Sequence, residues 1–342
     1  AKPYWSNRKS SELEVHALGW IILAAIIIAL ITVDIVGHVR TPHEPTIKEA
    51  AIWSIAYIAL GIAFGFVVWA GWGLTYAGEY WAGYITEKSL SLDNLFVFVL
   101  IISAFRVPRK YQQKVLLYGI VMALVLRLIF ILIGAAIIEQ FAWVFYIFGA
   151  WLLYTAFSQV REGVGDDDDD EYKETAFVRV VRKVFPVTDG FLSDKMLHRH
   201  AGKTYLTPML LVIIALGSTD IMFAFDSIPA IFGLTNEAYL VFAANAFSLL
   251  GLRQLYFLID GLLEKLVYLH YGLAAILAFI GVKLILHALH ENEVPFINGG
   301  QPFDVPEIGI PASLVFIGIT LVLTVIASMI KARYDKKKGI PA

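Results

Sequence analysis

Long apolar runs separated by short polar segments dominate the chain. A helix that crosses a bilayer needs about 20 consecutive, mostly apolar residues. Nine runs approach or exceed that length: residues 16–37, 50–72, 89–105, 114–138, 141–159, 206–232, 239–260, 268–289 and 311–331. The first run is not followed by a small-residue cleavage motif, so we interpret it as a retained helix. The pattern predicts an all-α, polytopic membrane protein with about nine transmembrane helices.

The basic residues between these runs predict an orientation. Nine crossings place the two termini on opposite sides of the membrane. If the C-terminus is cytoplasmic, the cytoplasmic segments are 39–49, 106–114, 160–205, 261–267 and the tail Lys331–Lys338. They hold about 20 of the 27 Lys and Arg residues, whereas the external loops 233–238 and 290–310 hold none. The positive-inside rule therefore favours a cytoplasmic C-terminus, although three basic residues in the N-terminal tail point the other way.

Composition supports the membrane class and excludes others. The 342 residues are 58% apolar and only 16% charged, with a mean hydropathy of +0.71. A soluble domain of this size cannot bury so much apolar surface, and a disordered chain would be far more polar. The net charge of −2 argues against a nucleic-acid partner. The absence of cysteine excludes disulfides, thiolate metal sites and thiol nucleophiles.

One long polar segment, residues 160–205, interrupts the apolar pattern. It contains an acidic run made of Asp166, Asp167, Asp168, Asp169, Asp170 and Glu171. The run is either a solvated linker or a collector of cations at a cytoplasmic mouth. The stretch Phe177–Phe185 alternates basic and apolar residues and is either an amphipathic interfacial helix or a strand.

Two parts of the chain resemble each other. At one common offset Glu87 aligns with Asp220, Asp93 with Asp226, and Asn94 with Ser227. Residues 118–134 also align with 244–260, placing Arg127 on Arg253, and 146–153 align with 278–285. Each part holds three spans, and an odd number of spans repeated in tandem inserts in opposite orientations. The sequence therefore predicts two inverted three-helix repeats, the architecture of many secondary transporters, with a site near the midplane.

This repeat divides the chain into five parts. They are residues 1–84 (two N-terminal helices), 85–159 (first repeat), 160–205 (cytoplasmic loop), 206–290 (second repeat) and 291–342 (external loop, last helix and basic tail).

Acids inside apolar runs are the candidate metal ligands, because an intramembrane carboxylate is costly unless it is paired or functional. We expect two layers of oxygen ligands. The first layer comprises Asp93, Asp226, Asn94, Ser227 and Asn245, and the second comprises Glu87 and Asp220. Pro229 lies within the sixth run, where a broken helix would offer carbonyl oxygens beside Asp226.

Four further charged residues lie in or beside the spans. Asp34 ends the first run, where it is either interfacial or a ligand. Arg127 and Arg253 are expected to pair with acids and hold the bundle together. Lys283 has the same interpretation, or is a mobile positive charge that occupies the site when the metal has left.

The ligand types favour a hard divalent cation. Carboxylate, amide and hydroxyl oxygens suit Mn²⁺, Mg²⁺ or Ca²⁺, and the histidines are not clustered as a Zn²⁺ site requires. Export against a potential of 100 mV costs about 4.6 kcal/mol for two charges. The chain has no GxxxxGK[ST] motif, so we expect proton or cation counterflow through the same acids.

Four strings of the sequence resemble the TerC family of integral membrane proteins, which includes the Alx type and is similar to the wider LysE-type exporters. They are EKSLSLDNLFVF (87–98), DSIPAIF (226–232), NAFSLLGLRQLYFL (245–258) and YLHYGLAAILAFIGVKLILH (268–287). The resemblance implies manganese export, an association with tellurium resistance, and a location in the bacterial inner membrane. The family's acidic motifs correspond to Glu87, Asp93 with Asn94, Asp220, Asp226 with Ser227, and Asp34.

The leading hypothesis is thus a Mn²⁺ antiporter in the lipid bilayer, alone or as a homo-oligomer or membrane complex. It needs no resident cofactor and no catalytic residue. The first alternative is a TerC-type scaffold that assists insertion or stress complexes without transport. A second alternative, an intramembrane aspartyl protease using Asp93 and Asp226, lacks the expected GxGD motif.

Overall fold

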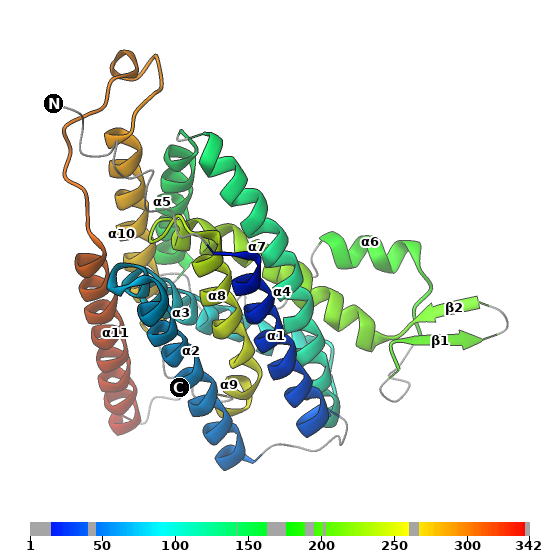
Figure 1. Ribbon diagram of the computed structural model, residues 1–342. Coiled ribbons are helices and arrows are strands. Elements are labelled where there is room, and N and C mark those ends of the chain that lie inside the picture. Colours follow the sequence, from blue (N-terminus) through cyan, green and yellow to red (C-terminus); the bar gives the residue numbers. More distant parts are fainter. Residues whose placement is uncertain are drawn as a thin grey trace.

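The computed structural model describes residues 15–39, 46–141, 143–162, 176–188, 195–200, 203–259 and 267–338, which form a bundle of long helices with a small appendage (Figure 1). The helices are α1 (Ala17–Asp34), α2 (Ile47–Trp72), α3 (Leu74–Ala104), α4 (Arg109–Gln140), α5 (Val144–Glu162), α6 (Ala176–Val184), α7 (Pro208–Phe232), α8 (Ala238–Leu250), α9 (Leu252–Ile259), α10 (Leu269–His290) and α11 (Ile310–Lys338). A π-helical turn, η2 (Ile35–Val39), follows α1, and a 3-10 turn, η5 (Asn298–Gly300), lies between α10 and α11. Strands β1 (Leu197–His200) and β2 (Lys203–Leu206) form an antiparallel hairpin.

Seven helical segments in the described residues are long and apolar enough to span a bilayer. They are Ala17–Gly37, Ile47–Trp72, Arg109–Ile138, Pro208–Phe232, Ala238–Leu258, Leu269–His290 and Ile310–Tyr334. The two other expected runs belong to α3 and α5, which are helical but more polar. Charged residues lower the hydropathy of α3 in particular, since it contains Glu79, Glu87, Lys88 and Asp93. The all-α membrane class is confirmed, and the count of nine crossings stays a prediction.

The third helix is longer than expected, because α3 begins at Leu74 and not near residue 89. Gly73 separates it from α2 and has φ +97°, a conformation that side chains with a Cβ rarely adopt. The polar first half of α3 is helical because its polar side chains find partners inside the bundle. The Tyr80 hydroxyl, for example, donates to the Gly61 carbonyl of α2 at 2.7 Å.

A helix break lies at Gly251 and not at Pro229. Helix α7 continues through Pro229, which lies in its last turn and so removes little of the hydrogen-bond ladder. Gly251 separates α8 from α9, and a Cβ there would lie 2.9 Å from Cβ of Tyr57. The Lys88 ammonium donates to the Ser248 carbonyl at 3.0 Å, which satisfies an acceptor near the end of α8. The expected broken helix beside Asp226 is therefore absent.

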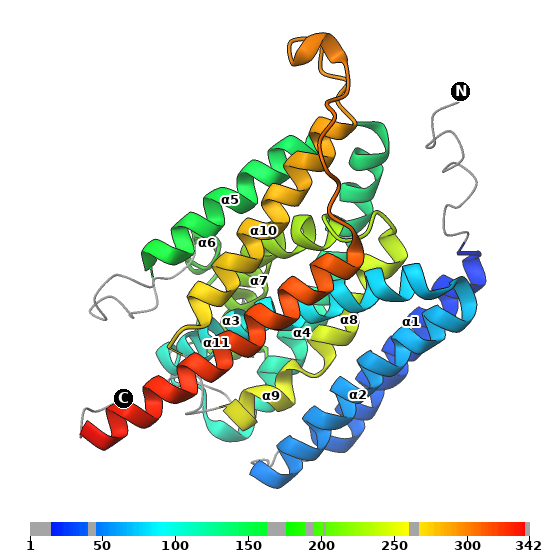
Figure 2. The same cartoon turned by 90° about the vertical axis from the view of Figure 1, so that its left-hand side faces the viewer.

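The bundle is organised around α8, in which every residue after Ala238 is buried. Helices α3 and α4 pack against α8, and α7 packs against both α3 and α4. Helices α1, α2 and α11 lie on the outside and expose apolar side chains, as helices in contact with lipid do (Figure 2).

The packing matches helices that the repeat makes equivalent. Helix α3 packs on α8 as α4 packs on α7, and α5 packs closely along α10. At the α5–α10 crossing Gly149 meets its repeat equivalent Gly281: a Cβ on Gly149 would lie 2.8 Å from the Gly281 carbonyl oxygen. These contacts are those expected of the predicted repeat, and the repeat and its inverted orientation stay predictions.

The segment between α5 and α7 contains the appendage (Figure 1). Of the two alternatives for Phe177–Phe185, the structure forms a helix, α6, with Val178 buried and Arg182 over the Phe105 ring. The β1–β2 hairpin, in which Leu197 pairs with Leu206, is a small β element in a chain that was expected to be all helical. The expected loop 160–205 is thus partly folded.

Candidate functional site

Arg127 lies in the middle of α4 and is almost completely buried. Its Nε and Nη2 donate to the two oxygens of Asp220, each at 2.9 Å, in a bidentate pair. Its Nη1 donates to Glu87, to Oδ1 of Asn245 at 2.6 Å and to Oγ of Ser227 at 3.2 Å. We call these five residues the Arg127 cluster.

Helix geometry brings the five residues of the Arg127 cluster together from four helices. Asp220 and Ser227 are seven residues apart on α7 and so share one face. Asn245 on α8 is oriented by its own amide, which donates to the Val241 carbonyl at 3.0 Å and leaves the oxygen toward Arg127. Gly217, one turn before Asp220, allows α4 and α7 to approach closely, because a Cβ there would collide with Met122.

The cluster carries two carboxylates and one guanidinium, all buried. Among the residues that the structure describes, Oε2 of Glu87 has no hydrogen-bond partner, so one acceptor of the pair is unsatisfied there. An unsatisfied charged oxygen is costly in a low-dielectric interior. Carboxylate, amide and hydroxyl oxygens therefore converge on a single position that holds a positive charge, here the guanidinium.

Arg253, the repeat equivalent of Arg127, forms a second buried centre with Asp34. Its Nη2 donates to Oδ1 of Asp34 at 3.0 Å, and its Nη1 donates to Gln113 at 2.9 Å. Tyr57 and Gln254 donate to the same Asp34 oxygen at 2.9 and 3.1 Å. This centre joins α1, α2, α4 and α9, and four hydrogen bonds tie its members together.

Asp226 lies apart from both centres. Its Oδ1 accepts hydrogen bonds from Nε1 of Trp151 at 2.8 Å and from the Thr155 hydroxyl at 2.9 Å, both on α5. It therefore connects α7 to α5. Asp226 and Ser227 are consecutive on α7, so their side chains point about 100° apart around the helix.

The remaining predicted residues are placed as follows. Asn94 is buried on α3, and its Nδ2 has no hydrogen-bond partner within the described part of the chain. Lys283 on α10 donates to the Ser313 hydroxyl at 3.2 Å and lines a polar cavity of about 370 Å³ with Glu79 and Glu307. The side chain of Asp93 and the acidic run Asp166–Glu171 lie outside the described residues.

The grouping differs from the two layers expected from the sequence. Ser227 and Asn245, expected beside Asp226, instead contact Arg127 together with the acids of the other layer. The reason is the helical period, which sets Ser227 over Asp220 and turns Asp226 away. In the part of the chain that the structure describes, no three His, Cys, Asp or Glu side chains are grouped as a metal site would be.

Sequence reasoning missed several polar partners. Tyr57, Gln113 and Gln254 complete the Asp34 centre, and Trp151 and Thr155 hold Asp226. Gln254 follows Arg253 directly, and Gln113 precedes an apolar run, so both gave a weak signal as polar residues beside a span. Tyr57 and Trp151 gave none, because aromatic residues are common in membrane helices.

Comparison with known proteins identifies relatives of the whole bundle. The family described as "Integral membrane protein TerC family" matches residues 72–336. The chain is 51% identical over 317 residues to "Uncharacterized membrane protein Rv2723" of Mycobacterium tuberculosis (strain ATCC 25618 / H37Rv), covering 92% of this chain and 80% of that protein. It is 37% identical over 315 residues to "Uncharacterized membrane protein STKORF319" of Myxococcus xanthus, covering 92% and 93%.

A further relative has a functional name. The chain is 35% identical over 331 residues to "Putative membrane-bound redox modulator Alx" of Escherichia coli (strain K12), covering 94% of this chain and 97% of that protein. No solved structure matches the chain. The family match and these relatives cover nearly all the helices described above, and the chain belongs to the TerC family of integral membrane proteins.

Proposed function

We propose that this protein exports a divalent metal cation, Mn²⁺, across the inner membrane, and that the Arg127 cluster is the central site. One observation carries the proposal: Glu87 and Asp220, which align in the predicted repeat, converge with Ser227 and Asn245 on the buried guanidinium of Arg127. A structural ion pair needs only one acid for one arginine. A site for a divalent cation needs two acids, because two carboxylates balance the charge of the ion.

In this proposal the guanidinium of Arg127 takes the place of the substrate. It compensates one of the two acid charges while no metal is bound, so that the two acids are not both left without a cation in the bundle. An arriving metal ion must displace Arg127 from the oxygens of Glu87 and Asp220, and departure of the ion lets Arg127 return. In this exchange the net charge of the two acids and their bound cation changes by one unit, from −1 with Arg127 to zero with a divalent ion, so the acids are never without a cation in a low-dielectric region.

Export needs a driving force, because moving two charges outward against 100 mV costs about 4.6 kcal/mol. We assign this driving force to the counterflow of protons or of another cation. Glu87 and Asp220 are the carriers that the geometry favours, since they are the acids beside Arg127. The oxygen ligands support a hard divalent cation, and the choice of Mn²⁺ rests on the family resemblance.

The name of Alx points to redox modulation, which this chain would have to perform without thiols, since its 342 residues contain no cysteine. Transport of a metal ion needs none. We therefore give the transport proposal priority over a direct redox role.

The test is transport in vesicles. Purified protein is reconstituted with a Mn²⁺-quenched dye inside, and Mn²⁺ is added outside under a proton gradient. We expect wild type to quench the dye, and Glu87→Gln or Asp220→Asn to slow quenching by about tenfold or more, as loss of metal-site ligands does. Ser227→Ala removes a neutral ligand and leaves the charges of the Arg127 cluster unchanged. Because no buried charge becomes unpaired, slower quenching by this variant would reflect the lost ligand and not misfolding.

Glu293→Gln is the matched control, because it removes an exposed carboxylate in the loop after α10. Size-exclusion profiles show whether each variant is folded. A wild type that quenches no faster than empty vesicles would favour the scaffold alternative. Variants that all transport at the wild-type rate would exclude the Arg127 cluster as the site. Unchanged rates with a protonophore and no other ion gradient would contradict the counterflow.

A further inference from the structure

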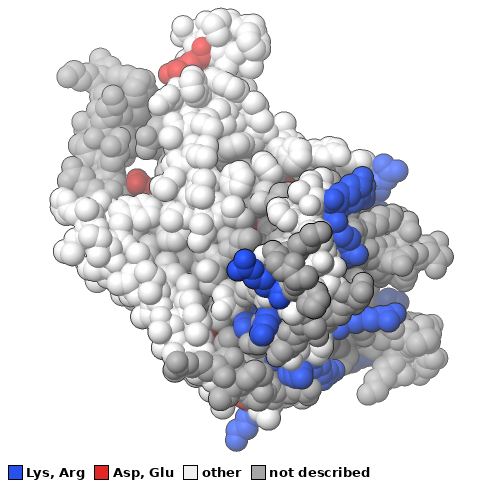
Figure 3. All heavy atoms as spheres, turned by 90° about the vertical axis from the view of Figure 1, so that its right-hand side faces the viewer, with Lys and Arg blue, Asp and Glu red and all other residues white. Residues whose placement is uncertain are grey.

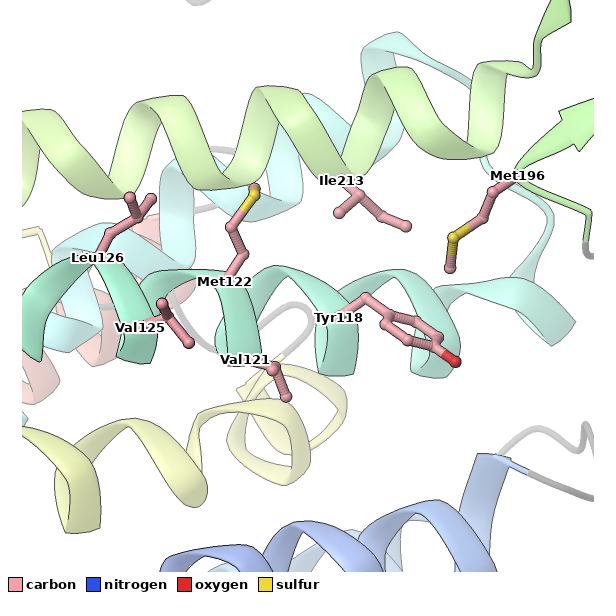
Figure 4. Close-up of a pocket in the computed structure, with 7 residues that line it drawn as sticks. All are labelled: Tyr118, Val121, Met122, Val125, Leu126, Met196 and Ile213. Carbon is pink, nitrogen blue, oxygen red and sulfur yellow. The ribbon is translucent and has the colours of Figure 1, made fainter. Parts of the chain in front are cut away.

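An apolar groove lies between α4 and α7 on the outer surface of the bundle (Figure 4). It has a volume of about 390 Å³, and its lining residues are Tyr118, Val121, Met122, Val125, Leu126, Met196 and Ile213. Val125 is 55% exposed and Tyr118 is 37% exposed, so the groove opens to the surface of a predicted membrane span. The surrounding medium there is lipid.

One end of the groove is built by a fixed polypeptide segment. Met196 and Tyr118 face each other at this end (Figure 4). The Thr207 hydroxyl, at the start of α7, donates to the carbonyls of Lys195 and Met196 at 2.7 and 3.0 Å, and its amide donates to Met196 at 3.1 Å. These bonds hold Met196 over the groove and place Lys195 beside its mouth.

In the part of the chain that the structure describes, the same end of the molecule is strongly basic. The described segments 105–118, 176–188, 195–200 and 203–207 contain no Asp or Glu. They contain ten Lys and Arg residues: Arg106, Arg109, Lys110, Lys114, Arg179, Arg182, Lys183, Lys195, Arg199 and Lys203. We call this the basic end, and Figure 3 shows its Lys and Arg side chains gathered on one face.

Lys114 connects the basic end to the groove, since it lies one helical turn before Tyr118 on α4. Helix α6 adds to it by packing on α7 through buried Val178 while Lys183 stays exposed. An amphipathic helix with a basic outer face is typical of the boundary between headgroups and acyl chains. The mouth of the groove therefore lies at headgroup level, and its apolar part runs toward the bilayer centre.

We propose that an anionic phospholipid of the surrounding membrane occupies this site. One acyl chain lies in the groove between α4 and α7, and the phosphate lies at its mouth beside Lys114 and Lys195. A phospholipid is the partner with both parts, an apolar chain and an anionic group at one end. An apolar transmembrane helix of a partner would fill the groove but leave the basic end without an anion.

The position gives the lipid access to the helix pair that holds the central cluster. Leu126 precedes Arg127 on α4, and Ile213 lies seven residues before Asp220 on α7. The proposal concerns binding alone and holds whether or not the protein is a transporter.

Lipid retention tests the proposal. Purified full-length protein in detergent is mixed with equal amounts of phosphatidylglycerol and phosphatidylcholine of identical acyl chains, and bound lipid is counted by native mass spectrometry. We expect wild type to retain phosphatidylglycerol preferentially. Lys114→Gln with Lys195→Gln should lower that preference about tenfold, because each basic residue near an anionic surface contributes separately. Val121→Trp with Val125→Trp should fill the groove and lower retention of both lipids.

Lys331→Gln with Arg333→Gln is the control, because it removes the same charge from α11, on the opposite side of the bundle from α6 in Figure 1. It should leave the preference unchanged. Equal retention of the two lipids by wild type would overturn the proposal. An unchanged preference for phosphatidylglycerol in the Lys114 and Lys195 variant would also overturn it. The same holds if the α11 control loses as much of that preference as this variant does. If groove filling alone has no effect, no acyl chain is seated there, and the proposal is equally overturned.

Discussion

Oδ1 of Asp34 accepts three hydrogen bonds, from Arg253, Tyr57 and Gln254. Because both charges are buried, removal of one leaves the other uncompensated. We predict that Asp34→Asn lowers the free energy of unfolding by about 3–5 kcal/mol, the cost typical of breaking a buried ion pair. Denaturant titration in mixed micelles, followed by tryptophan fluorescence, measures this change.

A double variant separates the charge effect from lost packing. Asp34→Asn combined with Arg253→Leu should be less destabilised than the sum of the two single variants, because no unpaired charge remains. Glu291→Gln is the matched control, since the half-exposed Glu291 pairs with His287 near the surface and its loss should change stability by about 1 kcal/mol or less. If Asp34→Asn leaves the free energy of unfolding unchanged, water or another group compensates the charge of Arg253.

At the scale of elements, apolar runs predicted most helices, because a span must satisfy its backbone internally and be apolar outside. They could not predict the first half of α3, in which polar residues such as Tyr80 are helical because of partners on α2. The sequence did not predict the break at Gly251 either, because the break depends on the close approach of Tyr57 to this glycine. At the site, the sequence alone indicated that Asp220 and Ser227 share one helix face, because they are seven residues apart. The convergence of both repeats' acids on Arg127 requires the tertiary fold.

The α5–α10 crossing depends on two small residues that meet. We predict that Gly149→Ala lowers the free energy of unfolding by about 1–3 kcal/mol, as overpacking does. Its Cβ would lie 2.6 Å from Ile285 Cγ1 and 2.8 Å from the Gly281 carbonyl, and a backbone atom cannot move aside easily. The same titration measures the change.

Gly318→Ala on α11 is the control for this substitution. Nothing lies within 4 Å of a Cβ there, so the change should be neutral or stabilising by about 0.5–1 kcal/mol, as Gly→Ala in a helix is. Equal effects of the two substitutions would mean that α5 and α10 do not approach as closely as the structure has them.

For the whole molecule, the distribution of charge and the fold agree on sidedness. The turn η5 and the end of α11 lie at opposite ends of the bundle (Figure 2). We therefore expect the basic end of α11, Lys331–Lys338, and the loop between α10 and α11, which has no Lys or Arg from 291 to 309, to face opposite sides of the membrane. The positive-inside rule assigns the basic side to the cytoplasm.

The lack of native cysteine makes this orientation directly measurable, because each introduced thiol is the single one in the chain. We predict that Glu293→Cys, in the loop after α10, reacts with a membrane-impermeant maleimide in intact cells. Arg333→Cys, at the end of α11, should react only after the membrane is permeabilised. The unsubstituted chain gives the background. The reverse pattern would invert the assigned topology, place the basic end outside and make the proposed movement of metal an import. Labelling of both positions in intact cells would instead mean that α11, which lies between them, does not cross the membrane.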